Sequence, residues 1–154
     1  MLSSLPNLVI LAAGAAEGGS RLNAFDNALL KAGIANWNLV RVSSILPPKA
    51  EITYEIPFIE KGSLVPIVLA EITSDKKGDI ISAAVAIGVG NEFGVIMEHS
   101  GRMEKEGVEE EVKRRVEEAF AMRNLDLRGL HIISSQHKVE KLGCAIAAAI
   151  LWWR

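Results

Sequence analysis

The fold is decided by residues 63–100, which read SLVPIVLAEITSDKKGDIISAAVAIGVGNEFGVIMEHS. Two runs rich in β-branched and other apolar residues, Ser63–Thr73 and Asp79–Val89, each predict a strand. The polar stretch between them, Ser74–Gly78, is typical of a turn, so a hairpin is expected. A further strand is expected over Gly94–Ser100, which makes the middle of the chain a run of strands without a helix.

A helix is expected on each side of this run. Apolar residues recur at helical spacing between Asn23, the expected N-cap, and Gly33, the expected stop. The clearest helix is Met103–Arg123, where one apolar stripe is surrounded by acidic and basic residues. These charges are most simply a solvated face.

More strands are expected towards the two ends of the chain. Asn7–Ala13 predicts a buried strand that ends at a glycine-rich loop, Gly14–Ser20. Asn38–Ile45 predicts a strand that the following prolines end. Leu130–His137 is a further candidate, whereas Cys144–Trp153 fits a buried helix or a buried strand equally well on periodicity alone.

The 154 residues, 49% of them hydrophobic, are enough for one domain with its own core. About six or seven strands and two helices are expected, without the regular alternation that builds a parallel sheet. We therefore predict an α+β fold, a layered α/β/β/α-type sandwich, as a single domain over residues 1–154.

Composition argues against several classes of protein. With a formal charge of −2, the sequence lacks the excess of basic residues that is typical of a nucleic-acid-binding protein. No run reaches the ~18 apolar residues of a membrane span, and residues 1–20 hold no Lys or Arg for a signal peptide. The single cysteine, Cys144, suits a reducing compartment. A cytoplasmic protein without nucleic-acid or membrane partners is expected.

The common catalytic motifs are missing. The glycines after the first strand match neither common phosphate-binding pattern. His99, His131 and His137 lack metal-ligand spacing, so no metal site is expected. Ser43 and Ser44 lie in no GxSxG elbow, which leaves a serine hydrolase possible but unsupported.

Four residues with hydroxyl or carboxyl side chains are nevertheless candidates for chemistry. Ser43 and Ser44 end a strand before two prolines, where a constrained backbone could let a serine hydroxyl attack the preceding carbonyl, although a plain turn is the simpler interpretation. Glu98 in an apolar strand is either exposed or an inward acid with the raised pKa of a proton donor. Asp26 near a helix N-terminus is favoured there by the helix dipole.

Taken together, four segments closely resemble the pyruvoyl-dependent arginine decarboxylases, best known from archaea. The resemblance covers nearly the whole chain, in order and at matching spacing. The segments are Asn23–Leu30, Asn38–Pro48, Gly94–Glu98 and Val139–Ala145. Within them, RVSSILPP at residues 41–48 and EKLGCA at residues 140–145 are the specific blocks.

The resemblance implies a proenzyme that cuts itself between Ser43 and Ser44. The Ser44 hydroxyl would attack the Ser43 carbonyl, and the resulting ester would eliminate and hydrolyse to a pyruvoyl group and ammonia. The products would be a β chain, residues 1–43, and an α chain, residues 44–154, that begins with the pyruvoyl group. This covalent cofactor takes the part that pyridoxal phosphate plays elsewhere, and no metal is implied.

The implied reaction is that of a lyase, which converts L-arginine to agmatine and CO₂ for polyamine biosynthesis. Glu98 matches the family's proton donor, Asp26 the residue that binds the substrate guanidinium, and Asn38 a site amide that polarises a carbonyl. The implied substrate-binding set is completed by Leu22, Ala35 and Trp37. The last two stand where the family usually has a glycine and a smaller aliphatic residue.

Spacing restricts how these residues can share one site. Asn38 and Ser44 are six residues apart, which is roughly 20 Å along a straight strand. Either the strand bends sharply or the two residues come from neighbouring subunits. The family forms trimers, often paired into hexamers, with active sites between protomers. We therefore expect Asp26 and Asn38 to face Ser44 and Glu98 of the adjacent chain.

Three alternatives stay open. The first is a pyruvoyl decarboxylase of another amino acid, although the carboxylate of Asp26 favours a cationic substrate. The second is an oligomeric domain of the same fold that does not process itself. The third is a serine hydrolase that uses Ser44.

Overall fold

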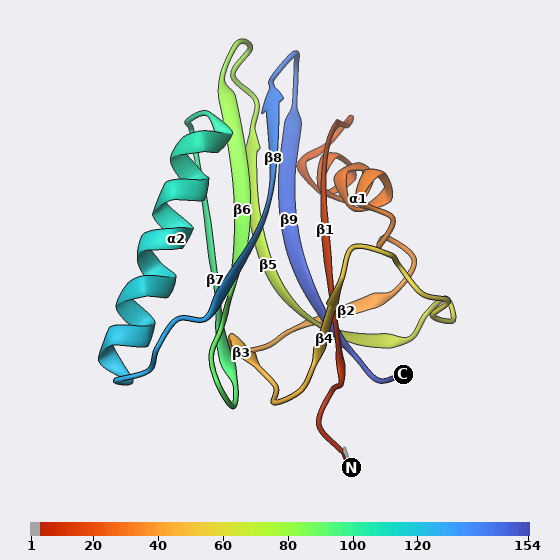
Figure 1. Ribbon diagram of the computed structural model, residues 1–154. Coiled ribbons are helices and arrows are strands. Elements are labelled where there is room, and N and C mark those ends of the chain that lie inside the picture. Colours follow the sequence, from red (N-terminus) through yellow and green to blue (C-terminus); the bar gives the residue numbers. More distant parts are fainter. Residues whose placement is uncertain (1–3) are drawn as a thin grey trace.

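The computed structural model describes residues 4–154, which form two stacked sheets, each covered on its outer side by one helix (Figure 1). The five-stranded sheet has the order β2-β5-β9-β1-β4, and the four-stranded sheet the order β3-β7-β6-β8. The predicted α/β/β/α sandwich is confirmed. The helices are α1 (Arg21–Ala32) and α2 (Lys105–Met122), and the strands are β1 (Leu8–Glu17), β2 (Asn38–Arg41), β3 (Ile45–Leu46), β4 (Glu51–Thr53), β5 (Leu64–Ser74), β6 (Ile80–Val89), β7 (Gly94–Gly101), β8 (Gly129–Lys138) and β9 (Gly143–Trp152).

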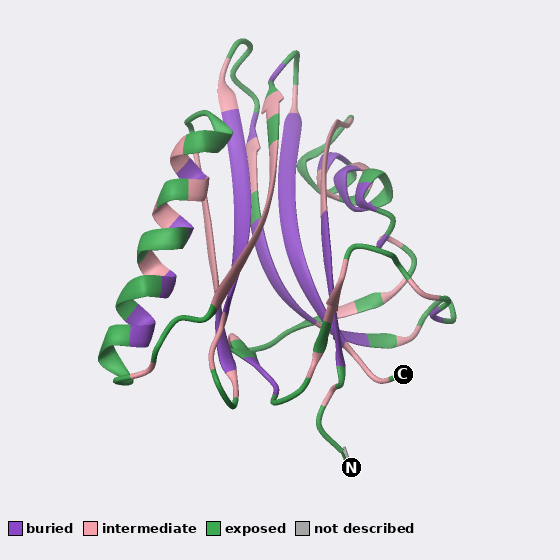
Figure 2. Cartoon of the chain, viewed as in Figure 1, coloured by how far each residue is buried: buried purple, intermediate pink, exposed green. Residues whose placement is uncertain are grey.

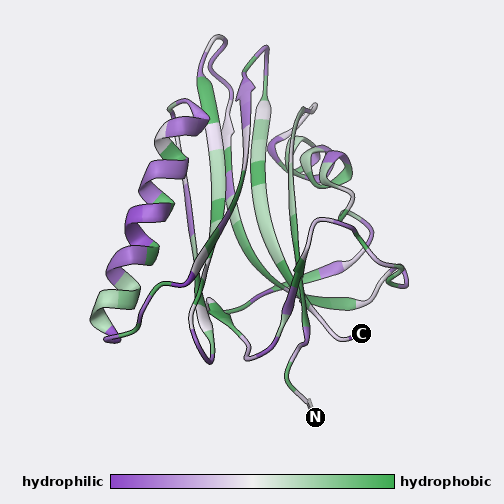
Figure 3. Cartoon of the chain, viewed as in Figure 1, coloured by the Kyte–Doolittle hydropathy of each residue, from purple (hydrophilic) through white to green (hydrophobic). Residues whose placement is uncertain are grey.

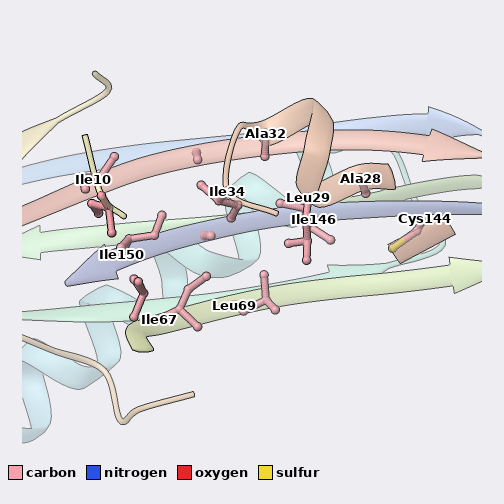
Figure 4. Close-up of a cluster of buried hydrophobic side chains, with 14 of the residues drawn as sticks. Ile10, Ala28, Leu29, Ala32, Ile34, Ile67, Leu69, Cys144, Ile146 and Ile150 are labelled. Atoms are coloured by element: carbon pink, nitrogen blue, oxygen red, sulfur yellow. The ribbon is translucent and has the colours of Figure 1, made fainter. Parts of the chain in front are cut away.

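Apolar side chains fill the three spaces between the four layers. The sheets are buried along most of their central strands, whereas both helices expose their outer faces (Figure 2). On α2, the buried stripe Val108, Val112 and Val116 packs on the four-stranded sheet, and most of the remaining surface is hydrophilic (Figure 3). On the other side, α1 packs small residues such as Ala28 and Ala32 against β1 and β9 (Figure 4).

The segment that periodicity left ambiguous is β9, the central strand of the five-stranded sheet. It pairs antiparallel with both β1 and β5. Ile146 and Ile150 face α1, while Ala147 and Ala149 face the other sheet. A strand buried on both faces shows no alternation of apolar and polar residues, which is why its sequence resembles a buried helix.

The expected hairpin of residues 63–89 is wrong. β5 lies in the five-stranded sheet and β6 in the four-stranded sheet, so the turn of residues 75–79 connects two layers instead of two paired strands. The reason is burial: β6 is buried along nearly its whole length and pairs on both sides, with β7 and β8. A turn signal shows that the chain reverses, but not with which strand it pairs.

The expected glycine loop at Gly14–Ser20 is also wrong in part. β1 continues to Glu17, paired with β9. Gly14 is needed within the strand because a Cβ there would lie 2.7 Å from the Ala28 carbonyl oxygen of α1. The N-cap of α1 is Ser20 rather than Asn23, since the Ser20 hydroxyl accepts the backbone N–H of Asn23 at 3.1 Å. The helix ends at Gly33 as predicted, in the left-handed conformation.

The strand expected over Asn38–Ile45 is broken in two. β2 pairs parallel with β5 in one sheet, and β3 pairs antiparallel with β7 in the other. Residues 42–44 therefore cross from the edge of one sheet to the edge of the other. We call these three residues the crossing.

Candidate active site

The crossing is fixed at both ends by backbone hydrogen bonds. The N–H of Val42 donates to the carbonyl of Ile67 on β5 at 3.0 Å, and the carbonyl of Ser44 accepts the N–H of Ile96 on β7 at 2.7 Å. The peptide between Ser43 and Ser44 lies between these two anchors. A cut there would leave each new end bound to a different sheet.

A cavity of about 430 Å³ lies at the crossing and contains Ser43, Ser44 and Glu98 in its wall. The structure thus brings together three of the residues singled out in the sequence, although more than fifty positions separate Ser44 from Glu98. The lining is otherwise mostly apolar. Its other members are Val42, Val68, Ile96, Met97 and Arg115.

Of the two interpretations of Glu98, an exposed carboxylate or an acid that points inward, the structure supports the second. Its side chain is half-buried, and its Oε2 is fully buried without a hydrogen-bond partner among residues 4–154. Burial raises the pKa of the carboxyl group, while the nearby positive charges of Arg41 and Arg115 lower it and the negative charge of Glu71 raises it further. The net effect is upward, so the carboxyl group keeps its proton to a higher pH than an ordinary glutamate.

Two arginines that the sequence reasoning did not assign to the site flank Glu98. Arg41 donates to the Leu69 carbonyl at 2.9 Å and to the Glu71 carboxylate at 2.7 Å. Arg115 donates to the carbonyl of Glu98 itself at 2.8 Å and to the Glu111 carboxylate at 3.0 Å. Both line a second cavity, of about 370 Å³, that also has Glu98 in its wall.

One signal could have identified Arg41, and none could have identified Arg115. Arg41 is the first residue of the specific block RVSSILPP. Arg115 lies in the charged sequence of α2, and its guanidinium donates to the Glu98 carbonyl on β7. Helical spacing cannot show that one charged residue beside the buried stripe reaches the neighbouring strand.

The expected substrate-binding residues lie elsewhere in the chain. Asp26 and Leu22 are exposed on α1, which covers the outer face of the five-stranded sheet (Figure 1). The Asn38 amide donates to the Gly62 carbonyl at 2.8 Å, and the Trp37 indole to the Ile59 carbonyl at 3.2 Å. These residues and the half-buried Ala35 line neither cavity at Glu98. Within one chain, the expected substrate-binding residues therefore do not share a pocket with Ser44 and Glu98.

The second specific block, residues 140–145, lies at a structural contact. The Glu17 carboxylate at the end of β1 accepts the backbone N–H groups of Lys141 at 2.7 Å and Leu142 at 3.0 Å, and contacts His137 at 2.5 Å. Burial alone would raise the pKa of Glu17, but these hydrogen bonds outweigh it and lower the pKa to about 2. We call this contact the Glu17 clamp, since it joins β1 to the turn between β8 and β9.

Residues 4–154 contain neither a cluster of metal ligands nor a helix that could span a bilayer. No group of three or more His, Cys, Asp or Glu side chains in that range could hold a metal ion. Within the same range, neither helix has the length and hydropathy needed to span a bilayer.

Known proteins similar to this chain share one description. Residues 8–153 match the family model of pyruvoyl-dependent arginine decarboxylase. The pyruvoyl-dependent arginine decarboxylase of Pyrococcus furiosus is 48% identical over 151 residues, 96% of each chain. That of Methanocaldococcus jannaschii is 46% identical over 97% of this chain and 92% of its own. That of Methanothermobacter thermautotrophicus is 43% identical over 92% of this chain and 94% of its own.

Proposed function

Because the chain belongs to the pyruvoyl-dependent arginine decarboxylase family, we propose that it decarboxylates L-arginine after converting its own Ser44 into the pyruvoyl group. The reaction yields agmatine, a precursor for polyamine biosynthesis, and CO₂. The observation that carries the assignment to residues is the shared cavity of Ser43, Ser44 and Glu98 at the crossing. A buried free thiol, Cys144, is consistent with action in the cytoplasm.

The surroundings of Ser44 fit a group made from the chain itself. The carbonyl of residue 44 is bound by Ile96, and the next residue, Ile45, pairs with Val95 on β7, so residue 44 keeps its place when the peptide bond before it breaks. The cavity offers space for a substrate beside it. Once formed, the pyruvoyl group supplies a ketone that binds the substrate amino group and an electron sink for the departing CO₂.

Self-cleavage uses only the chain's own atoms and water. The Ser44 hydroxyl oxygen attacks the Ser43 carbonyl carbon, and the bond from that carbon to the Ser44 nitrogen breaks, which converts an amide into an ester with a free amine. Elimination then releases the Ser43 carboxylate and leaves a carbon–carbon double bond in residue 44. Water replaces the nitrogen, which departs as ammonia, and the ketone remains. The two anchors of the crossing hold the new chain ends during these steps.

Glu98 has the properties that the protonation step needs. After CO₂ leaves, the α-carbon of the product must receive a proton. Burial raises the pKa of the Glu98 carboxyl group, so it keeps this proton to a higher pH than an ordinary glutamate. We assign Glu98 as the proton donor, and its position in the wall of the Ser44 cavity supports this role.

Substrate binding is proposed to need a second copy of the chain. Asp26 is exposed, and its carboxylate suits the guanidinium of arginine, with Leu22, Ala35 and Trp37 around it. Since these residues and Asn38 lie away from the Ser44 cavity of their own chain, we place them against the cavity of a neighbour in a trimer or a dimer of trimers. Large apolar side chains exposed nearby support burial by another copy: Leu22 (76% exposed), Leu30, Val40, Phe58 (93% exposed) and Leu64.

A substrate panel tests the function. Purified protein is incubated with arginine, lysine, ornithine, histidine and aspartate, and CO₂ release is measured. Release from arginine, and none from the Ser44→Ala variant, is expected. Release only from a neutral or acidic amino acid would contradict the arginine assignment, and equal release by the Ser44→Ala variant would contradict the role of Ser44.

A further inference from the structure

We propose that two guanidinium–carboxylate pairs, Arg115–Glu111 and Arg41–Glu71, position Glu98 and control when it carries a proton. The inference rests on the proposed function, in which Glu98 is the proton donor. Neither pair touches the scissile peptide through a hydrogen bond in the structure. Both act through Glu98, so their members are positioning residues rather than catalytic ones.

Arg115 connects α2 to the strand that carries the acid. Its Nη1 donates to the main-chain carbonyl of Glu98 at 2.8 Å, and its Nε donates to Glu111 Oε1 at 3.0 Å, one turn earlier on the helix. The guanidinium is therefore held from two sides. Because this hydrogen bond is to the main chain of Glu98, it fixes the Cα from which the carboxyl group extends into both cavities.

Arg41 connects the strand before the scissile peptide to β5. Its Nη1 donates to the Leu69 carbonyl at 2.9 Å, and its Nη2 pairs with Glu71 Oε1 at 2.7 Å. It stands two residues before Ser43, at the end of β2. The block RVSSILPP thus contributes two features next to Glu98: the serine pair and the fixed positive charge of Arg41.

The charged groups around Glu98 are of both signs and come from β2, β5 and α2. Arg41 from β2 and Arg115 from α2 favour its ionised form, and Glu71 from β5 opposes them. Glu111 from α2 pairs with Arg115 and also with Arg114. On β7, burial first and Arg115 second lower the pKa of His99, so its ring is neutral at neutral pH. On β6 the residue paired with Glu98 is Val85.

This balance has a chemical consequence. Two unpaired guanidinium groups would hold Glu98 as a carboxylate, which has no proton to donate. Each guanidinium already has a carboxylate partner, and burial of the Glu98 carboxyl group outweighs the two positive charges, so the net change in its pKa is upward. Removal of a positive charge and removal of a negative charge should therefore move the titration of Glu98 in opposite directions.

The test follows the Glu98 carboxyl group directly, by infrared spectroscopy of the protonated carboxyl stretch, with the Glu98→Gln variant to identify it. In Arg115→Met, the titration should move to higher pH than in the unaltered protein. In Glu71→Gln, and in Glu111→Gln, it should move to lower pH, because a guanidinium loses its partner. Lys113→Met removes one positive charge from an exposed position of α2 and should leave the titration in place.

Kinetics then separate positioning from charge. Arg115→Lys keeps the charge but loses the two-sided hydrogen bonding, so the pH at which kcat is half-maximal should stay in place while kcat falls about tenfold or more. If Arg115→Met does not fold, Glu111→Gln still tests the effect of charge, because it should move the Glu98 titration to lower pH.

Shifts of the Glu98 titration in the same direction in Arg115→Met and Glu71→Gln, or no shift in either, would overturn the inference. The titration does not depend on turnover. If the unaltered protein releases no CO₂ from arginine, the proposed function is wrong, and the infrared result still decides whether these pairs control Glu98.

Discussion

Glu17 and Glu98 are two glutamates in opposite environments. The carboxylate of Glu17 accepts backbone N–H groups and contacts His137, and its pKa falls to about 2. Glu98 has a buried oxygen without a partner in the described chain, and burial raises its pKa. Hydrogen bonds to the ionised carboxylate stabilise Glu17 as a structural contact. Glu98 has a buried oxygen without such bonds within residues 4–154, so its carboxyl group keeps its proton to a higher pH. We therefore expect substitution of Glu17 to lower the stability of the protein and substitution of Glu98 to lower its activity.

The largest expected effect is on activity at Glu98. Glu98→Gln keeps the size of the side chain but cannot donate a carboxyl proton, so decarboxylation of arginine should fall by ~10²-fold or more. Stability to denaturant should hold or increase, since the variant removes a group whose ionised form is disfavoured by burial. Steady-state CO₂ release and urea unfolding measure the two effects. Near-normal turnover would refute the role of Glu98 as proton donor.

The matching change at Glu17 should have the reverse outcome. Glu17→Gln loses the charge that two backbone N–H groups and His137 share, which should lower the free energy of unfolding by about 2 kcal/mol. The kcat at a temperature where the variant is folded should change little, because the Glu17 clamp is remote from the Ser44 cavity. A large loss of kcat without a loss of stability would show that the clamp is part of the site.

A smaller effect is expected at Gly143, the first residue of β9. A Cβ at this position would clash with the Glu17 carboxylate and the His137 ring. Because these are ends of side chains that can shift, Gly143→Ala should destabilise the protein by about 1 kcal/mol. In a Glu17→Gln background the cost should be smaller, and a double-mutant cycle of unfolding free energies measures the coupling. Strict additivity would indicate that Gly143 acts independently of the clamp.

The pH dependence of stability should separate the two glutamates further. Glu17 has a pKa in the folded protein below its unfolded value of 4.5, so its contribution is complete above that value and is lost as the pH falls through about 2. Glu98 has a raised pKa, so its contribution declines as the pH rises above the unfolded value. The measurement is the difference in unfolding free energy between the unaltered protein and each glutamine variant, followed from acid to neutral pH. This difference should increase with pH for Glu17→Gln and decrease with pH for Glu98→Gln.

Sequence patterns predicted the elements better than their partners. The apolar stripe of α2 and the β-rich runs of β5, β6 and β7 locate those elements within one or two residues. Pairing was harder because the turn after β5 carries the same polar residues whether it joins two paired strands or two layers. Gly14 was misjudged for a related reason: a glycine required by the close approach of α1 looks like a glycine in a loop.

The candidate site shows a similar limit. Ser44 and Glu98 were recognised through the resemblance of their segments to a known family, and the fold places both in one cavity wall. The break between β2 and β3 was foreseen only as one of two ways to satisfy spacing, since residues 38–45 form one continuous β-rich run. Arg115 gave no signal, because its role depends on where α2 packs and not on its local sequence.

The central claim is that Ser44 becomes a ketone at a new chain end, and intact-mass spectrometry of freshly purified protein tests it most directly. Two chains are predicted, residues 1–43 and residues 44–154, with a borohydride-reducible carbonyl on the longer one, while Ser44→Ala remains a single folded chain. One uncut polypeptide of 16.6 kDa without a reactive carbonyl would contradict the account.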